Sequence, residues 1–356
     1  MKENNLLLID IDNYLYNYHL LKKISGKNVI PVVKDNAYGL IDHYCADLLE
    51  KEGASLFAVA SLQEAVKLRK HGIKADILIL GYVEDFDSVR RYSLSLLTPD
   101  EEYVTKHADR LKGIKVHIKV NTGMNRIGVL PLEVPAVLKQ LQQAGAQVAG
   151  IMTHLAKASD PIFTKQQYDC FLEAVTGCGY QFSHIHSSAS EGSLLYPQNP
   201  FTDIRCGIAL CGYGSKELKP VVSLIAKVIS VKQVPEGESI SYERNYISQG
   251  AGYILTVSIG YGDGFLRANT SKKVYVEGEY GTIAGNVCMD MILVHTKKYH
   301  PVGSIVELYG KHISIEERAA ELSTIVYELM TSINSRVTRA YLKEGNIIHK
   351  INERFD

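Results

Sequence analysis

The chain has 356 residues, and its 39 Lys and Arg balance its 39 Asp and Glu. A chain without net charge has no overall field that attracts a polyanion or an anionic membrane, so we expect neither nucleic acid nor a membrane as a partner. Hydrophobic residues make up 46% of the sequence, and they form no run near the ~20 residues that cross a membrane. These features exclude a disordered or membrane-embedded chain and predict a cytoplasmic globular protein.

The cysteine spacing matches neither the disulfide framework of a small domain nor a CxxC zinc site. We therefore expect reduced, mostly buried thiols and no bound metal. The six cysteines are Cys45, Cys170, Cys178, Cys206, Cys211 and Cys288.

Short apolar runs alternate with helical segments in the first two thirds of the chain. Continuous apolar runs are typical of strands buried on both faces, and helices between them imply parallel crossovers. Eight such units in about 200 residues predict an α/β fold, a (β/α)8 TIM-type barrel over residues 1–223, with an open doubly wound sheet as the alternative. The expected strands are 28–34, 56–60, 77–80, 94–97, 116–120, 148–152, 182–186 and a short one near Ile204.

From about Leu224 the strands follow one another through glycine-rich turns without helices between them. This pattern predicts a mainly β C-terminal domain over residues 224–356, with one helix at about 315–333 followed by a basic tail. The expected strands are 224–234, 252–260, 274–276, 282–294 and 304–308.

Polar residues follow several of the barrel strands, where barrel enzymes carry their active sites. Lys34 ends the first apolar run and precedes Asp-Asn-Ala-Tyr-Gly. A lysine amine can form a Schiff base with a carbonyl group, although its position alone is equally typical of a solvated strand end. Other strand ends carry Lys119, Arg126, Thr153, His154, His186, Ser187, Ser188 and Arg205. Together these groups suit an aromatic cofactor that bears a phosphate.

The segments that contain these residues resemble the alanine racemases, and the resemblance covers nearly the whole chain. The matching segments are VVKDNAYG (32–39), HIKVNTGMNRIG (117–128), THLAKASD (153–160), RCGIALCGYG (205–214), GYGDG (260–264), AGNVCMDM (284–291) and VYELM (326–330). The resemblance implies a barrel that binds pyridoxal 5'-phosphate, a second β domain, and interconversion of L- and D-alanine that supplies D-alanine for peptidoglycan.

The same resemblance assigns two catalytic bases. Lys34 would hold the cofactor and act as one base, and Tyr242 in the Ser241-Tyr242 pair would be the other. Two bases on opposite faces of the cofactor let a Cα proton leave one face and return to the other, which serves both enantiomers.

The resemblance also implies the residues that bind the cofactor. Arg205 would face the pyridine nitrogen, where a permanent cation opposes ring protonation and so favours racemisation over transamination. His154 would pack near the ring. The implied phosphate contacts are Tyr38, Ser188, the backbone of Gly207 and Ile208, and Tyr327.

Four further residues are implied at the substrate side. Arg126 would contact the cofactor's phenolic oxygen and the substrate carboxylate, and Lys119 stands where many members carry a carbamylated lysine that orients this arginine. The backbone of Met289 would bind the substrate carboxylate, and Tyr261 would act as an entrance gate. Tyr242, Tyr261 and Met289 reach the partner's cofactor in this family, which implies a homodimer with shared active sites.

Five positions depart from the family pattern, and they leave the choice of substrate open. They are Asn121 for Asp, Asn125 for Gly, Ser187 for Asn, Cys206 for Pro and Asn286 for Arg. A serine or broad-specificity racemase is therefore an alternative, although Tyr327 limits the pocket in the alanine enzymes. A non-enzymatic pyridoxal-phosphate carrier would lack the second domain. A related decarboxylase would carry a cysteine-based motif late in the chain, whereas Cys288 lies in the Cys-Met-Asp pattern of the racemases.

Overall fold

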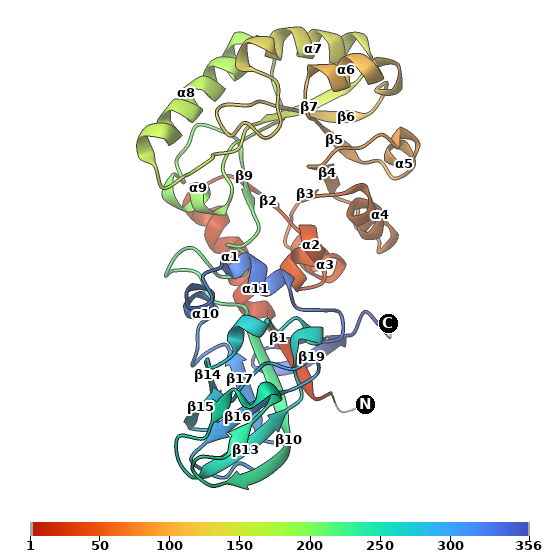
Figure 1. The fold of residues 1–356 in the computed structure, drawn as a ribbon. Helices are drawn as coiled ribbons and strands as arrows, with labels where there is room; N and C mark the ends of the chain where they lie inside the picture. Colours follow the sequence, from red (N-terminus) through yellow and green to blue (C-terminus); the bar gives the residue numbers. More distant parts are fainter. Residues whose placement is uncertain (1–2, 355–356) are drawn as a thin grey trace. The chain divides into compact units, whose positions relative to one another are not determined.

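The computed structural model describes residues 3–354 and divides the chain into two compact units. Tyr14–Lys219 form one unit, called here the barrel unit. The residues up to Asn13, together with the chain from Pro220 onwards, form the other, called the β unit (Figure 1).

Eight parallel strands form the sheet of the barrel unit, in the order β2-β9-β8-β7-β6-β5-β4-β3. The sheet closes between its first and last strands, because Val32 bridges Ala58 and the Val33 N–H donates to the Ala58 carbonyl at 2.9 Å. The predicted barrel is confirmed, and each predicted strand overlaps an observed one. The strands are β2 Asn28–Pro31, β3 Leu56–Val59, β4 Asp76–Ile79, β5 Ser95–Thr98, β6 Lys115–Lys119, β7 Gln147–Met152, β8 His184–His186 and β9 Asp203–Cys206.

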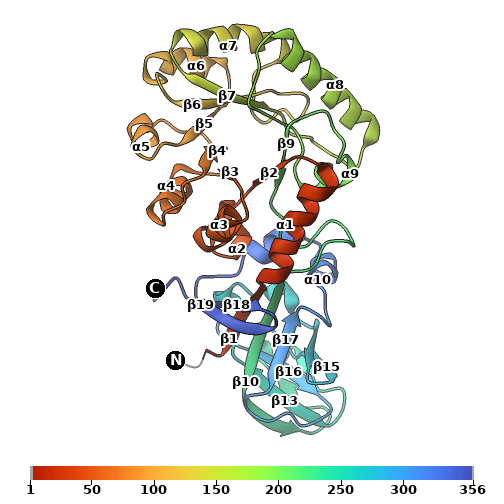
Figure 2. The same cartoon turned by 180° about the vertical axis from the view of Figure 1, so that it is seen from behind.

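Helices lie outside this sheet, as Figures 1 and 2 show. Their apolar faces follow the helical period: α7 buries Val134, Val137, Leu138 and Leu141. The helices are α1 Ile11–Ser25, α2 Lys34–Gly39, α3 Asp42–Lys51, α4 Leu62–Lys70, α5 Phe86–Arg91, α6 Glu101–His107, α7 Val134–Gln143, α8 Pro161–Gly177 and α9 Ser190–Leu195, with short 3-10 turns η1 Ala108–Arg110 and η2 Pro131–Glu133.

A nine-stranded sheet forms the core of the β unit, in the order β13-β16-β15-β14-β17-β10-β1-β18-β19, and β10 also pairs with β13. Its strands are β1 Asn5–Asp10, β10 Val222–Val234, β13 Gly252–Val257, β14 Lys273–Val276, β15 Glu279–Ile283, β16 Ile292–Thr296, β17 Ile305–Tyr309, β18 Thr338–Lys343 and β19 Asn346–Ile351. The remaining elements are β11 Ser239–Ile240, β12 Tyr246–Ile247, η3 Tyr242–Arg244, η4 Tyr261–Asp263, η5 Arg267–Asn269, α10 Ile315–Glu321 and α11 Val326–Thr331.

The start of the chain differs from the expected division at residue 223. Strand β1 pairs antiparallel with β10, with Leu7 opposite Leu224, and parallel with β18, with Leu7 opposite Arg339. The first strand therefore belongs to the β unit and not to the barrel. A short apolar run carries no signal of its partner strand, so the sequence could not place it.

Three expectations for the β unit need correction. The single helix at 315–333 is two helices, α10 and α11, because Ser323 between them has a φ of 55°. The expected basic tail is the antiparallel hairpin of β18 and β19. The expected strand 282–294 is the end of β15 and the start of β16, joined by a loop that carries Cys288 and Met289.

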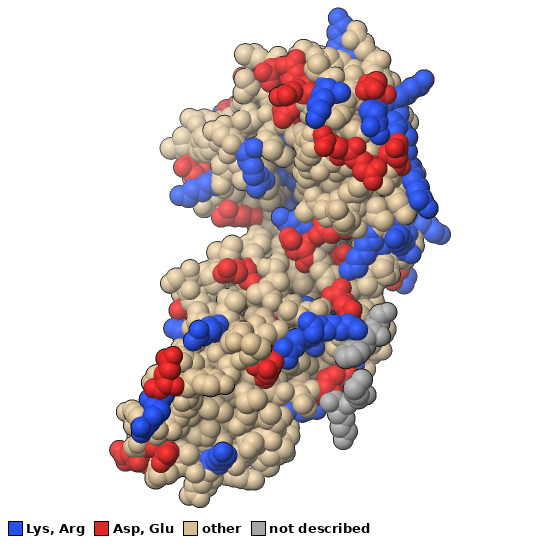
Figure 3. All heavy atoms as spheres, turned by 45° about the vertical axis from the view of Figure 1, so that its right-hand side comes forward, with Lys and Arg blue, Asp and Glu red and all other residues tan. Residues whose placement is uncertain are grey.

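Within residues 3–354, no helix is long and apolar enough to cross a membrane. On the face drawn in Figure 3, Lys and Arg are interspersed with Asp and Glu. All six cysteines are free thiols, and Cys45, Cys206 and Cys211 are buried.

Candidate active site

Lys34 begins a turn with unusual backbone geometry at the carboxyl end of β2. The next four residues, 35–38, have φ values of 52° or 57° and form one turn of left-handed helix. This conformation costs an L-residue about 1–2 kcal/mol, so a run of four is held against a considerable strain. The turn leaves Lys34 half-buried at the barrel end.

Tyr38 and Gly207 meet beside this turn. Tyr38 is buried, and a Cβ atom on Gly207 would lie 2.2 Å from its hydroxyl oxygen. A glycine is therefore required directly after β9 for the hydroxyl to lie against the backbone. The N–H groups of Gly207 and Ala209 donate to Ser190 Oγ, both at 3.2 Å, so a second hydroxyl lies against the same segment.

Ser188 lies next to β9, since its carbonyl accepts a hydrogen bond from the Arg205 N–H at 2.9 Å. Its hydroxyl lies 2.7 Å from that of Tyr168 and 3.3 Å from that of Ser187. Both serines are buried. Hydroxyl groups can donate to a phosphate without adding a titrating charge, so this cluster suits a phosphate site.

Arg205 is a buried cation with neutral hydrogen-bond partners. Its Nη1 lies 2.9 Å from His186 Nδ1, and its Nη2 lies 3.0 Å from His154 Nδ1. Nη2 also donates to the carbonyls of Thr153, at 3.0 Å, and Ser187, at 2.9 Å. Burial lowers the pKa of Arg205 to about 10, so it keeps its charge at neutral pH.

The guanidinium also determines which ring nitrogen of each neighbouring histidine carries the proton, because it can only donate hydrogen bonds. The Nδ1 atoms of His186 and His154 must therefore be acceptors. His186 Nε2 then carries a proton and donates to His117 Nδ1, which lies 3.0 Å away. Burial, with the charge of Arg205 as one further cause, lowers the pKa of His154 and His117 to about 3 and that of His186 well below its usual range.

Lys119 ends β6 and is buried, and its Nζ donates to the Val120 carbonyl at 3.0 Å. Burial, followed by the charges of Arg205 and Arg126, lowers the pKa of Lys119 to about 7. A substantial fraction of this amine is therefore neutral at physiological pH. Arg126 is exposed in the following loop.

Asn121 and Asn125, two of the residues that depart from the family pattern, form hydrogen bonds with each other in that loop. Asn121 Oδ1 accepts hydrogen bonds from the N–H groups of Gly123 and Asn125, at 3.2 and 3.0 Å. Asn121 Nδ2 donates to Asn125 Oδ1 at 3.0 Å, and Asn125 has a φ of 54°. Asparagine tolerates this left-handed conformation better than most residues, so the pair preserves the turn without the usual glycine.

Three candidates of the β unit lie on exposed neighbouring loops. The exposed fractions of Tyr242, Tyr261 and Met289 are 67%, 42% and 54%. The Tyr261 N–H donates to the Cys288 carbonyl at 3.0 Å, which holds Tyr261 and Met289 close together. Ser241 Oγ, next to Tyr242, donates to the Asn286 carbonyl at 3.3 Å. The fourth candidate, Tyr327, lies on α11 and is 40% exposed.

The matches to known families cover both units. Residues 9–215 match the alanine racemase N-terminal domain, and residues 221–341 match the alanine racemase C-terminal domain. The chain belongs to the alanine racemase family. The alanine racemase of Staphylococcus epidermidis is 33% identical over 364 aligned positions, covering 96% of this chain and 95% of that protein.

Solved structures of the family have the same fold. The alanine racemase from Bacillus anthracis with bound L-Ala-P has a TM-score of 0.92 at 33% identity, covering 100% of this chain and 99% of that one. The alanine racemase from Bartonella henselae with covalently bound pyridoxal phosphate has a TM-score of 0.87 at 27% identity, covering 96% of this chain and 100% of that one.

The residues at the barrel end fit the pyridoxal phosphate on which alanine racemases depend. Lys34 offers an amine for a covalent link, and the hydroxyls of Tyr38 and Ser188 can donate to a phosphate. The missing Cβ of Gly207 lets the Tyr38 hydroxyl lie directly against the backbone. Arg205 adds a fixed charge whose described partners include no carboxylate.

The alanine racemase motifs did not reveal every residue of this site. Tyr168 and Ser190 lie outside the quoted motifs, and nothing in the sequence marks their contacts with Ser188 and Gly207. The sequence also did not predict the contact of His186 with His117. Its only indication of this contact is that each of two barrel strands carries a histidine.

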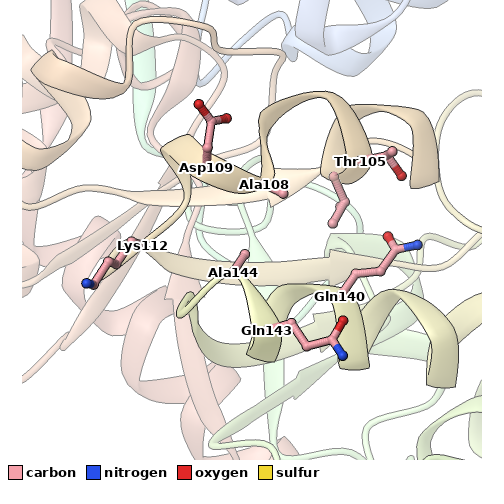
Figure 4. Close-up of a pocket in the computed structure, with 8 residues that line it drawn as sticks. Thr105, Ala108, Asp109, Lys112, Gln140, Gln143 and Ala144 are labelled. Atoms are coloured by element: carbon pink, nitrogen blue, oxygen red, sulfur yellow. The ribbon is translucent and has the colours of Figure 1, made fainter.

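A separate pocket of about 520 Å³ lies in the outer helical layer of this racemase fold and contains none of the candidate site residues (Figure 4). Its lining residues come from α6, η1 and α7 and the turns beside them. They are Val104, Thr105, Ala108, Asp109, Lys112, Gln140, Gln143 and Ala144. The pocket is therefore not a candidate for the active site.

Proposed function

We propose that this protein interconverts L- and D-alanine with pyridoxal 5'-phosphate and so supplies D-alanine for peptidoglycan. The observation that carries the proposal is the buried Arg205, which is held by neutral acceptors at the same barrel end as Lys34. The relatives named alanine racemase, 33% identical or more over nearly the whole chain, support it. We also propose that the protein is cytoplasmic, as expected from the sequence.

When bound, pyridoxal phosphate supplies a carbonyl for the covalent link and a conjugated ring that accepts electron density from the substrate Cα. Arg205 would hold a positive charge beside the ring nitrogen and so would oppose its protonation. By weakening the ring as an electron sink, Arg205 would favour return of the proton to Cα over its transfer to the cofactor. Arg205 in this way favours racemisation over transamination.

Two residues move the proton. Lys34 would take or give the Cα proton on one side of the substrate, and Tyr242 of the partner subunit would do so on the other. Each base must lose its proton in one direction of the reaction and regain it in the other, because the two enantiomers react from opposite faces. The exposure of Tyr242 supports a role at a surface that a second subunit covers.

The other proposed contacts hold the cofactor and substrate. Tyr38, Ser188, Tyr327 and the backbone of Gly207 and Ile208 bind the phosphate, and His154 packs near the ring. Arg126 binds the substrate carboxylate together with the backbone of Met289 of the partner subunit. Tyr261 of the partner subunit lines the entrance.

We also propose that Lys119 is carbamylated. Its neutral amine attacks CO2, forms an N–C bond and releases one proton, which leaves an anion on the side chain. The lowered pKa of Lys119, about 7, supplies the neutral amine. The resulting negative charge removes the repulsion between Lys119 and the two arginines and orients Arg126.

The deciding experiment is an assay of the purified protein with added pyridoxal phosphate, in which L-alanine and L-serine are offered separately. We expect rapid formation of D-alanine, weak turnover of serine, and near-complete loss of activity in the Tyr242→Phe variant. Faster turnover of serine would leave the two bases in place and overturn the substrate assignment. Cofactor binding without turnover of either amino acid would favour a carrier.

A further inference from the structure

Glu64 joins the strained turn of Lys34 to the neighbouring strand and helix. Its Oε1 accepts a hydrogen bond from the Asp35 N–H at 2.6 Å. Its Oε2 accepts from the N–H groups of Ala60 and Ser61, at 2.8 and 3.0 Å. One carboxylate therefore serves both the capping box of α4 and the residue that directly follows Lys34.

A second side chain of α4 contacts the same turn. Lys67 Nζ lies 3.2 Å from Asn36 Oδ1 and 2.8 Å from Asp42 Oδ1. Asn36 Oδ1 also accepts from the Asp42 N–H at 3.1 Å. The first turns of α4 thus provide contacts to two of the four left-handed residues, whose conformation persists only if the surroundings hold it.

We propose that Glu64 is a positioning residue for Lys34, which holds the left-handed turn so that the lysine amine stays fixed at the barrel end. The proposal rests on the racemase function above, in which Lys34 carries the cofactor and moves a proton. An ionised carboxylate suits the role because it has only acceptor atoms, and all three of its partners here are N–H donors. An amide in its place would turn an NH2 group towards one of these donors.

The Glu64→Gln variant tests the proposal, and the chain contains a matched control. In the β unit, Ser314 and Glu317 form the same kind of capping box at the start of α10, where Glu317 Oε2 accepts from the Ser314 N–H at 3.1 Å. Glu317→Gln therefore weakens an equivalent helix start in the other unit. Ser61→Ala is the second control, since it removes the hydroxyl half of the α4 capping box and keeps the contact of Glu64 with Asp35.

Two measurements separate positioning from general destabilisation. Amide hydrogen exchange of residues 35–38 in the cofactor-free protein needs no substrate, so it tests the turn independently of the proposed activity. The rate at which added pyridoxal phosphate becomes covalently attached reports the placement of Lys34. We expect Glu64→Gln to speed the exchange and slow the attachment by roughly tenfold each, while Glu317→Gln and Ser61→Ala change neither by more than about twofold.

Equal effects of Glu64→Gln and Ser61→Ala would overturn the proposal, because both would then act only through the start of α4. Unchanged exchange in Glu64→Gln would overturn it as well. Lys67→Met guards against a Glu64 variant that does not fold, since it removes the contacts of α4 with Asn36 and Asp42 and leaves the capping box intact. We expect faster exchange of residues 35–38 in this variant too, and exchange at the wild-type rate would contradict the proposed contribution of α4. If the exchange changes as expected but no racemase activity is found, the turn assignment stands and the proposed function fails.

Discussion

The hydroxyl of Tyr38 lies so close to Gly207 that a single added methyl group there would come within 2.2 Å of it. Tyr38 belongs to the turn after β2 and Gly207 to the segment after β9, and these strands are neighbours in the barrel. The closeness brings the Tyr38 hydroxyl, a donor that suits a phosphate group, against the backbone segment whose Gly207 and Ala209 N–H groups donate to Ser190 Oγ.

The Gly207→Ala variant should therefore bind pyridoxal phosphate at least about tenfold more weakly, because the new methyl group displaces Tyr38. A titration followed by the absorbance of the bound cofactor measures this change. Gly177→Ala is the control, since a Cβ there meets no atom within 4 Å. Equal affinity of both variants would show that the contact of Tyr38 with Gly207 does not shape the site.

Arg205→Glu should raise the proportion of transamination. A carboxylate beside the ring nitrogen favours its protonation, which strengthens the ring as an electron sink and lets the proton reach the cofactor. The measurement is the ratio of pyruvate to D-alanine formed from L-alanine. An unchanged ratio in a folded, cofactor-bound variant would show that Arg205 does not control the outcome.

Carbamylation of Lys119 should depend on pH, because only the neutral amine reacts with CO2. The pKa of about 7 means that protonation removes this form as the pH falls below 7. Carbon NMR of protein equilibrated with 13C-labelled bicarbonate should show a carbamate signal at pH 8 that weakens towards about pH 6. The signal should be absent in Lys119→Ala, and a bare ammonium group in a wild-type density map at pH 8 would refute the modification.

Acid should destabilise the protein before most carboxylates become protonated. His117 and His154 have a pKa of about 3 in the folded protein, and that of His186 is also strongly lowered. In the unfolded chain the pKa of a histidine is about 6.5. Below that pH the unfolded chain therefore binds more protons than the folded protein, and the free energy of unfolding falls. Urea unfolding at several pH values between about 6.5 and 5 measures the slope, which should be smaller in His117→Asn.

The proposal that two subunits share their active sites can be tested by mixing two inactive variants. Lys34→Ala and Tyr242→Phe each lack one base. In a mixed dimer with shared sites, one site keeps both bases, so equal amounts of the two proteins should recover about a quarter of the wild-type activity after subunit exchange. If each subunit used its own Lys34 and Tyr242, the mixture would remain inactive.

The sequence by itself determined the elements and the positions of most candidate residues. Strands β3 (56–59) and β4 (76–79) are short, mainly apolar runs, and helix α4 begins at a capping box of Ser61 and Glu64, which are three residues apart. These signals are local, because they depend on hydrophobic periodicity and on side chains within one turn. The same apolar runs placed Lys34 and Arg205 at strand ends, and the resemblance to the family then implied their roles.

Only the tertiary structure decided which of these residues touch. The pairing of β1 with β10, the approach of Tyr38 to Gly207, and the contact of Arg205 with His186 all join segments that are distant in the chain or lie on different strands. The left-handed backbone after Lys34 is also poorly marked in its sequence, since Asp35 and Asn36 tolerate positive φ but Ala37 and Tyr38 disfavour it. Such features depend on strand order and on contacts like that of Glu64 with Asp35, which stabilise a conformation that the local residues disfavour.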